Sequence, residues 1–145
     1  LIKELPLVFE ETIHIKQYYL SNNKNMVQRL RIFNKENAIM SFKEKTSKIS
    51  KYEFEYNIPL EDANKMISIA DAPFIDKKRH IIHIDSLKWE IDEFLDKNKG
   101  LIIAEVELRT EYQSINIPNW IDKEVTNDKK YYNYNLALKP YTLWL

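Results

Sequence analysis

The sequence predicts a mainly β protein of the α+β class, in which two groups of antiparallel strands are separated by one helix. Apolar and polar residues alternate in seven segments, and short polar turns of the kind found in hairpins join several of them. Segment 60–71 instead carries apolar residues every three to four positions, which indicates a helix. The single glycine is Gly100, which excludes a glycine-rich phosphate-binding loop.

The composition is that of one folded domain over residues 1–145. With 145 residues and a hydrophobic fraction of 44%, the chain is long and apolar enough to bury a core. Its 22 basic and 22 acidic residues cancel, so a basic field that would attract nucleic acid is absent. The lack of cysteine excludes disulfides and thiolate metal sites. Without a run of about 18 apolar residues we expect no membrane partner and a cytoplasmic location.

Four strands are predicted before the helix, at 12–20, 26–33, 38–46 and 51–59. They are rich in β-branched and aromatic residues, and the connections at 21–25 and 34–37 are short and polar. Such short connections imply antiparallel pairing. Alternation within the fourth strand predicts that Phe54 and Tyr56 are buried on the face opposite Glu53 and Glu55.

The helix at 60–71 begins after Pro59, and its first turn contains Glu61 and Asp62, which suit the positive end of the helix dipole. Strands at 74–85 and 87–95 then form a hairpin, and another strand follows at 101–109. We expect the core to include Trp89 and Trp120. Further on, one helical turn is expected at 120–125 and a short helix within 127–138, and the tail from 139 to 145 is expected to pack back. Several antiparallel strands of this kind form a barrel or a sandwich.

Like charges recur two residues apart on these strands, so the members of each pair share one face. The basic members are Arg29, Arg31, Lys43, Lys45, Lys77 and Arg79, and the acidic members are Glu53, Glu55, Glu90, Asp92, Glu105 and Glu107. For any one strand, a solvated face is the ordinary explanation. Exposed strands usually mix the two signs, however, whereas here the signs are segregated by strand. The acidic set could hold a divalent metal and the basic set a polyanion.

Other reactive residues do not form a recognisable site. Ser21 and Ser41 lack a paired histidine and aspartate, so a nucleophilic triad is not supported. The histidines at 14, 80 and 83 are scattered, and we expect them to be ordinary surface residues.

Eight short motifs occur in an order and at intervals that resemble the CYTH superfamily, also called triphosphate tunnel metalloenzymes. The sequence is most similar to the short bacterial members that act as inorganic triphosphatases. The motifs are Ile15-x-Gln17-x-Tyr-Leu20, Val27-x-Arg29-Leu-Arg31, Ser41-x-Lys43, Glu53-Phe-Glu-Tyr-x-Ile-Pro59, Lys77-x-Arg79, Trp89-Glu-Ile-Asp92, Gly100-Leu-x-x-Ala-Glu105-Val-Glu107-Leu108 and Tyr132-Asn-Tyr-Asn-Leu-Ala137.

This resemblance implies an eight-stranded antiparallel β-barrel tunnel and a phosphoric anhydride hydrolase that uses Mg²⁺ or Mn²⁺. The implied substrate is inorganic triphosphate or a nucleoside triphosphate. The implied substrate-binding residues are Arg29, Arg31, Lys43, Lys77 and Arg79, with Glu53 and Glu55; the implied metal ligands are Glu105, Glu107 and Asp92; and the implied catalytic residues are Glu105, Glu107 and Lys77. Positioning, charge neutralisation and a metal-activated water would supply most of the rate.

The sequence departs from the family pattern in three places. The Glu-x-Glu-x-Lys segment of the first strand is missing, and we expect it just upstream of Leu1, where it would add the eighth strand. Tyr18 stands where the family usually has glycine, and His80 where it has tyrosine. The alternatives are a non-catalytic module that binds polyphosphate or nucleotide, an adenylyl cyclase or thiamine triphosphatase on the same fold, and an ordinary β domain. Unpaired strand edges also make a homodimer possible.

Overall fold

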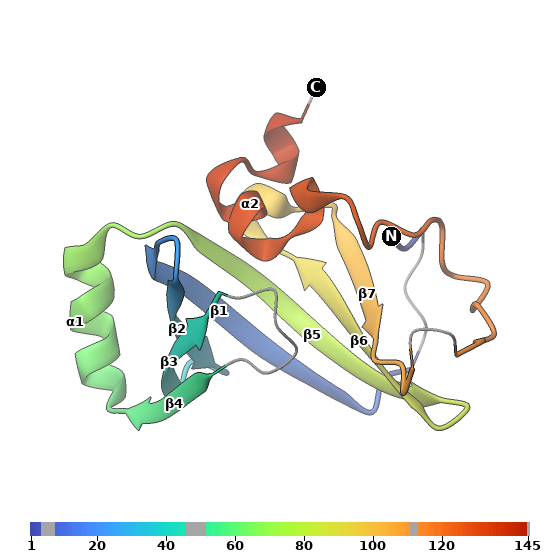
Figure 1. Cartoon of the computed structure of the whole chain (residues 1–145), viewed down its shortest axis with the longest axis horizontal. Helices are drawn as coiled ribbons and strands as arrows, with labels where there is room; N and C mark the ends of the chain where they lie inside the picture. Colours follow the sequence, from blue (N-terminus) through green and yellow to red (C-terminus); the bar gives the residue numbers. More distant parts are fainter. Residues whose placement is uncertain (4–7, 46–51, 111–112, 145) are drawn as a thin grey trace. The chain divides into compact units, whose positions relative to one another are not determined.

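The computed structural model describes residues 1–3, 8–45, 52–110 and 113–144, and these residues form seven strands (Figure 1). The strands are β1 (Glu11–Asn22), β2 (Met26–Phe33), β3 (Asn37–Glu44), β4 (Glu53–Ile58), β5 (Phe74–Ile84), β6 (Leu87–Phe94) and β7 (Ile102–Val106). Their order in the sheet is β4-β3-β2-β1-β5-β6-β7. The mainly β class and the seven antiparallel strands are therefore confirmed. Hydrogen bonds between described residues leave β4 and β7 as edge strands, so they do not close the sheet into a barrel.

The chain divides into two compact units. The helix-bearing unit comprises His14–Asp76, and the C-terminal unit comprises Leu1–Ile13 and Lys77–Leu145. The boundaries fall inside β1 and β5, so each of these strands contributes to both units. That the 145 residues behave as a single domain stays a prediction. No helix in the described part of the chain is long and apolar enough to cross a membrane.

In the helix-bearing unit, one face of β2 and β3 forms the core beneath helix α1 (Leu60–Ala70) (Figure 1). Leu30 pairs with Met40 and Ile32 with Ala38, so these apolar side chains share a face, and Ala63 of the helix packs on them. The helix follows Pro59, and Asp71 ends it in the left-handed conformation. Residues that alternate with Leu30 and Ile32 must therefore point away from the helix.

The expected burial of Phe54 and Tyr56 is wrong, because their side chains are 52% and 55% exposed. Both lie on the helix-covered face, opposite Phe42 and Met40 of β3. Among the described strands, however, β4 is an edge strand with a neighbour on one side only. Alternation predicted the correct face, but burial also requires a covering element.

The core of the C-terminal unit forms around Trp89 and Ile91, as expected. The rings of Trp89 and Trp120 pack edge to face, with their centroids 5.5 Å apart. The expected helical turn at 120–125 is wrong. Ile121 instead forms an isolated antiparallel bridge with Ile2, and the backbone N–H of Asp122 donates to the carbonyl of Leu1. Pairing with the N-terminal segment therefore replaces local helical hydrogen bonds.

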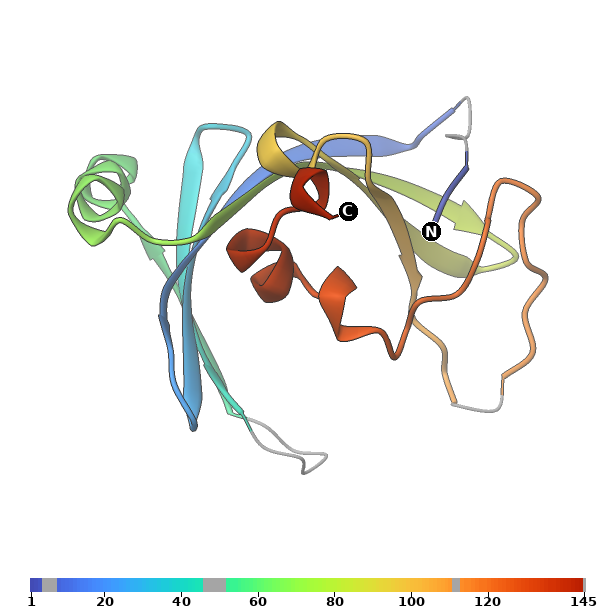
Figure 2. The same cartoon turned by 90° about the horizontal axis from the view of Figure 1, so that it is seen from above.

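The end of the chain packs back on the C-terminal unit, as expected, over the described residues up to 144. The elements there are the 3-10 turn η1 (Asp96–Asn98), the 3-10 turn η2 (Lys129–Tyr131), helix α2 (Asn133–Leu138) and the 3-10 turn η3 (Tyr141–Leu143). Figure 2 shows η3 beside η1. The buried amide of Asn98 joins these elements, since it donates to the carbonyl of Leu136 and accepts from the backbone N–H of Tyr141.

Replacing Leu30 by alanine is expected to lower the free energy of unfolding by about 2–5 kcal/mol, because a fully buried leucine leaves a cavity when truncated. Chemical denaturation measures this change. The matched control is Ile69→Ala on α1, where the side chain is 83% exposed and little change is expected. Equal effects of the two substitutions would show that the face beneath α1 is not the core of this unit.

Candidate functional site

Five charged side chains of the C-terminal unit share one face of strands β5, β6 and β7. Arg79 lies directly opposite Asp92, and Glu90 lies directly opposite Glu105. Lys77 precedes Arg79 by two residues and therefore has the same orientation. Ile91, which lies between Glu90 and Asp92 in sequence, points to the opposite face and into the core. The pleat of the sheet thus separates this charged cluster from the apolar interior.

The carboxylate of Asp92 is the centre of the cluster. Lys77 Nζ donates to its Oδ2 at 2.8 Å, while Arg79 donates through Nε to Oδ1 at 2.8 Å and through Nη2 to Oδ2 at 3.0 Å. The remaining arginine nitrogen, Nη1, lies 2.8 Å from Oε2 of Glu90. Lys77 and Asp92 are only 2% and 3% exposed. Of the two cations, Arg79, whose side chain is 22% exposed, is the one that solvent reaches.

Burial and charge act in opposite directions on the pKa values of this cluster. Burial raises the pKa of Asp92, but the two cations at hydrogen-bonding distance outweigh it and hold that pKa below its ordinary value. Burial also lowers the pKa of Lys77, against the opposing effect of Asp92. The pKa of Arg79 is raised because its carboxylate neighbours outweigh its burial. The guanidinium therefore remains charged in any ordinary buffer.

A residue not singled out from the sequence, Asn133, also contacts the cluster. Its Oδ1 accepts from Lys77 Nζ at 3.0 Å. Asn133 is the first residue of α2 and lies 56 residues from Lys77 in the chain. Its uncharged side chain is not part of the pattern of paired charges, and its place in the Tyr132-Asn-Tyr-Asn-Leu-Ala137 motif is the sequence feature that indicates a role.

The helix-bearing unit carries a second charged face, on the side of β2, β3 and β4 away from α1. Arg29 Nη2 lies 3.8 Å from Glu53 Oε1, and Arg31 Nη2 donates to Glu55 Oε1 at 3.3 Å. Register places Lys43 opposite Glu53. Five residues predicted from the sequence are therefore brought together here, with each arginine reaching across β3 to a carboxylate of β4.

The family model of the CYTH domain matches residues 2–138 of the chain, a range that contains the seven strands and both charged faces. The chain belongs to the CYTH domain family. The resemblance found in its motifs is thereby confirmed, and the match includes residues of both charged faces.

Two curated relatives of this CYTH protein are both called inorganic triphosphatase. The one from Acetivibrio thermocellus is 39% identical over 127 residues, which are 87% of this chain and 81% of the relative. The one from Nitrosomonas europaea is 30% identical over 93 residues, 62% of each protein. Among solved structures, the crystal structure of the inorganic triphosphatase NE1496 superposes with a TM-score of 0.77 at 25% identity, covering 94% of this chain and 92% of that one.

The acidic residues expected to bind metal in this CYTH chain lie in different surroundings. Glu105 is exposed on β7, and Glu107 is exposed just beyond the end of that strand, which stops at Val106 rather than at the expected residue 109. Both oxygens of Asp92 already accept from cations. Within the described ranges, no three histidine, aspartate or glutamate side chains gather as a metal-binding group. The metal roles of these residues stay predictions.

The histidines of this CYTH chain each contact a carboxylate, and the expectation of ordinary surface residues is wrong for His80. Its ring is buried, stacks on Phe9 with centroids 4.2 Å apart, and lies within hydrogen-bonding distance of Thr12 Oγ1 at 2.8 Å and Glu93 Oε1 at 3.1 Å. Because Thr12 is 68 residues away in sequence, only the folded chain reveals this environment. The contacts of His80 with Phe9 and Thr12 connect the start of β1 to β5.

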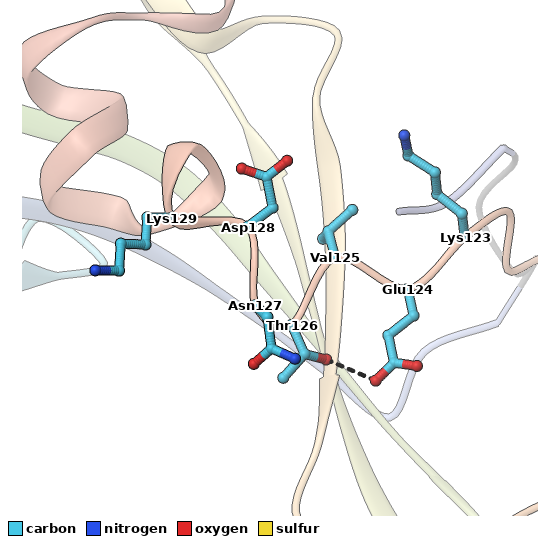
Figure 3. Close-up of a pocket in the computed structure, with 7 residues that line it drawn as sticks. All are labelled: Lys123, Glu124, Val125, Thr126, Asn127, Asp128 and Lys129. Carbon is cyan, nitrogen blue, oxygen red and sulfur yellow. Dashed lines mark hydrogen bonds between the residues drawn. The ribbon is translucent and has the colours of Figure 1, made fainter.

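A separate open hollow lies in the loop from Lys123 to Lys129 (Figure 3). Its lining includes Glu124, which accepts from Thr126 Oγ1 at 3.0 Å, and Asp128. None of the residues predicted for phosphate or metal binding lines this hollow. Apart from Glu107, which lies beyond the end of β7, the predicted site residues lie on the two charged sheet faces.

Replacing Asp92 by asparagine is expected to lower the free energy of unfolding by roughly 3–5 kcal/mol, because two cations then lack their shared counter-ion in a buried site. Chemical denaturation at pH 7 measures the change. The control is Glu61→Gln, which removes an exposed ion pair with Lys65 and should have little effect.

The effect of Asp92→Asn should also depend on pH. A carboxylate whose folded pKa is lowered stabilises the fold above its unfolded pKa, about 3.9, and loses that contribution as the pH falls through the folded pKa. The difference in stability between wild type and variant should therefore be constant above about pH 5 and shrink below about pH 4. A difference that persists unchanged in strong acid would contradict the charged state of Asp92.

Proposed function

We propose that this CYTH protein hydrolyses inorganic triphosphate with the help of a divalent cation. The observation that carries the proposal is the 39% identity to an inorganic triphosphatase over 87% of the chain. The charged faces support it chemically. Polyphosphate binding requires several fixed cations, and Lys77 and Arg79 are held by defined hydrogen bonds rather than left as mobile surface charges.

In this proposal, the basic side chains bind the oxygens of the substrate. Tripolyphosphate carries about four to five negative charges, and its cleavage depends mostly on positioning and charge neutralisation. Arg79 binds a phosphate oxygen by exchanging the carboxylate of Glu90 for it, since that ion pair is partly exposed. Arg29, Arg31 and Lys43 of the helix-bearing unit are proposed to bind phosphate in the same way, with Glu53 and Glu55 as their resting counter-ions.

The proposed cation is Mg²⁺ or Mn²⁺, because carboxylate oxygens are the ligands that such hard cations prefer. Glu105 and Glu107 would hold it, and Glu90, opposite Glu105 across β6 and β7, adds a carboxylate beside them. Asp92 fits less well, because a metal would compete with Lys77 and Arg79 for both of its oxygens. When bound, such an ion neutralises phosphate charge and lowers the pKa of a coordinated water. The chain's own cations orient the substrate.

The full-length protein is expected to release phosphate from tripolyphosphate in the presence of Mg²⁺ or Mn²⁺ and to stop when the metal is chelated. Glu107→Gln should lower kcat by at least about 100-fold, because the neutral amide is a poor ligand for a hard cation, while the thermal unfolding temperature stays the same. Released phosphate is measured by colorimetric assay.

The control for Glu107→Gln is Glu124→Gln, which changes the same residue type in the loop at 123–129 of the same unit. It should retain wild-type turnover. Turnover of Glu107→Gln at the wild-type rate would remove the metal assignment of Glu107, and no release from the wild-type protein with either metal would count against the proposed function.

Tripolyphosphate is expected to be turned over faster than ATP or thiamine triphosphate, because the charged faces present cations for phosphate and the sequence shows no base-recognition pocket. Relative kcat/KM values for the three compounds measure this preference. A higher value for ATP with formation of cyclic AMP, or for thiamine triphosphate, would assign another activity of the same fold. Calorimetric binding of tripolyphosphate without hydrolysis would instead indicate a non-catalytic polyphosphate-binding module.

A further inference from the structure

The ammonium group of Lys77 has two acceptors that come from separate parts of the C-terminal unit. Asp92 Oδ2, on β6, lies 2.8 Å from Nζ, and Asn133 Oδ1, at the start of α2, lies 3.0 Å from it. An ammonium has three N–H donors and no acceptor, so two of its three directions are fixed by these contacts. Of these two acceptors, Asp92 is charged and Asn133 is not, so Asn133 orients the lysine without adding charge.

Asn133 is held in place by contacts that lie outside strands β5 and β6. The preceding turn η2 is capped by Asp128, whose Oδ1 accepts from the backbone N–H of Lys130 at 3.3 Å. Leu136, one turn of helix after Asn133, is fully buried, and its carbonyl accepts from the buried amide of Asn98. These contacts hold α2 against η1, so the amide of Asn133 is presented to Lys77 by a segment with hydrogen bonds of its own.

The orientation of Lys77 also affects Arg79. Oδ2 of Asp92 accepts from both Lys77 Nζ and Arg79 Nη2, at 2.8 and 3.0 Å. If Nζ lost its contact with Asn133, it would be free to shift about this shared oxygen in search of another acceptor. Arg79 would then lose the fixed geometry of its two hydrogen bonds to Asp92. A small displacement of a cation that binds substrate is sufficient to slow a reaction that depends on positioning.

We propose that Asn133 is a positioning residue for triphosphate hydrolysis, one that fixes the ammonium of Lys77 and, through the shared oxygen of Asp92, the guanidinium of Arg79. The inference rests on the proposed function for its kinetic consequence, whereas the contact itself is independent of turnover. Asn133 does not touch the substrate; it acts by limiting where the two cations lie.

Three substitutions on one helix separate positioning from a general effect on α2. Asn133→Ala removes the acceptor and should lower kcat for tripolyphosphate by about tenfold, the loss expected for one hydrogen bond to a charged group. Asn133→Asp keeps an oxygen at the same place and should restore kcat to within about threefold of wild type. Its added negative charge should raise KM for the polyanion, because like charges repel.

The matched control is Asn135→Ala. The amide of Asn135 lies on the same helix and donates to the carbonyl of Lys129 at 2.7 Å, so this substitution also removes one side-chain hydrogen bond but leaves the acceptor of Lys77 intact. It should leave kcat and KM unchanged. An equal loss of kcat in Asn133→Ala and Asn135→Ala would overturn the proposal and assign the effect to the stability of α2.

The NMR signal of the Lys77 ammonium group tests the contact without any measurement of turnover. This signal is assigned by its absence from the spectrum of Lys77→Met. A buried, hydrogen-bonded ammonium exchanges its protons slowly enough to be seen. The signal should persist in wild type, Asn133→Asp and Asn135→Ala and disappear in Asn133→Ala. An unchanged signal in Asn133→Ala overturns the proposal. A wild-type protein without triphosphatase activity overturns the proposed function instead, and the signal still decides whether Asn133 holds Lys77.

Discussion

The two-oxygen contact of Asp92 with Lys77 and Arg79 is the interaction on which the geometry of the C-terminal unit depends. Removing these charges from water is costly, and the cost is offset only when every partner is in place. That condition requires the register of β5 and β6, which the two-residue turn Asp85-Ser86 sets. Both turn residues have positive φ, at 53° and 65°, as the tight turns that favour hairpin twist demand.

A shift of this register by one residue would turn every side chain of one strand to the opposite face. Asp92 would then enter the apolar core, while Ile91 would leave it. The aromatic and aliphatic residues that pack against Trp120 therefore stabilise the charged cluster indirectly, because they make the alternative register unfavourable. The apolar core and the charged cluster lie on opposite faces of the same hairpin. Packing of the core therefore stabilises the register on which the hydrogen bonds of the charged cluster depend.

The sequence was sufficient to predict what depends on local periodicity. Alternation placed Arg29 and Arg31 on one face of β2, and the three-to-four spacing located the helix at 60–71. The sequence was not sufficient to predict features that depend on partners far away in the chain. The burial of His80 requires Thr12, the exposure of Phe54 follows from the place of β4 at a sheet edge, and Asn133 reaches Lys77 only because α2 is anchored on η1.

The same contacts clarify how the acidic residues differ from one another, although their spacing in the sequence is alike. Asp92 is buried and shared by two cations, so its role in the resting protein is that of a counter-ion. Glu90 is partly exposed and paired with one nitrogen of Arg79, and Glu105, opposite it, is exposed. Of these three carboxylates, Glu90 and Glu105 are the ones that solvent reaches, whereas Asp92 is enclosed. Under the proposed function, a divalent cation bound to Glu90 would release that nitrogen of Arg79 for a phosphate oxygen, so metal and polyanion would favour each other's binding on this face.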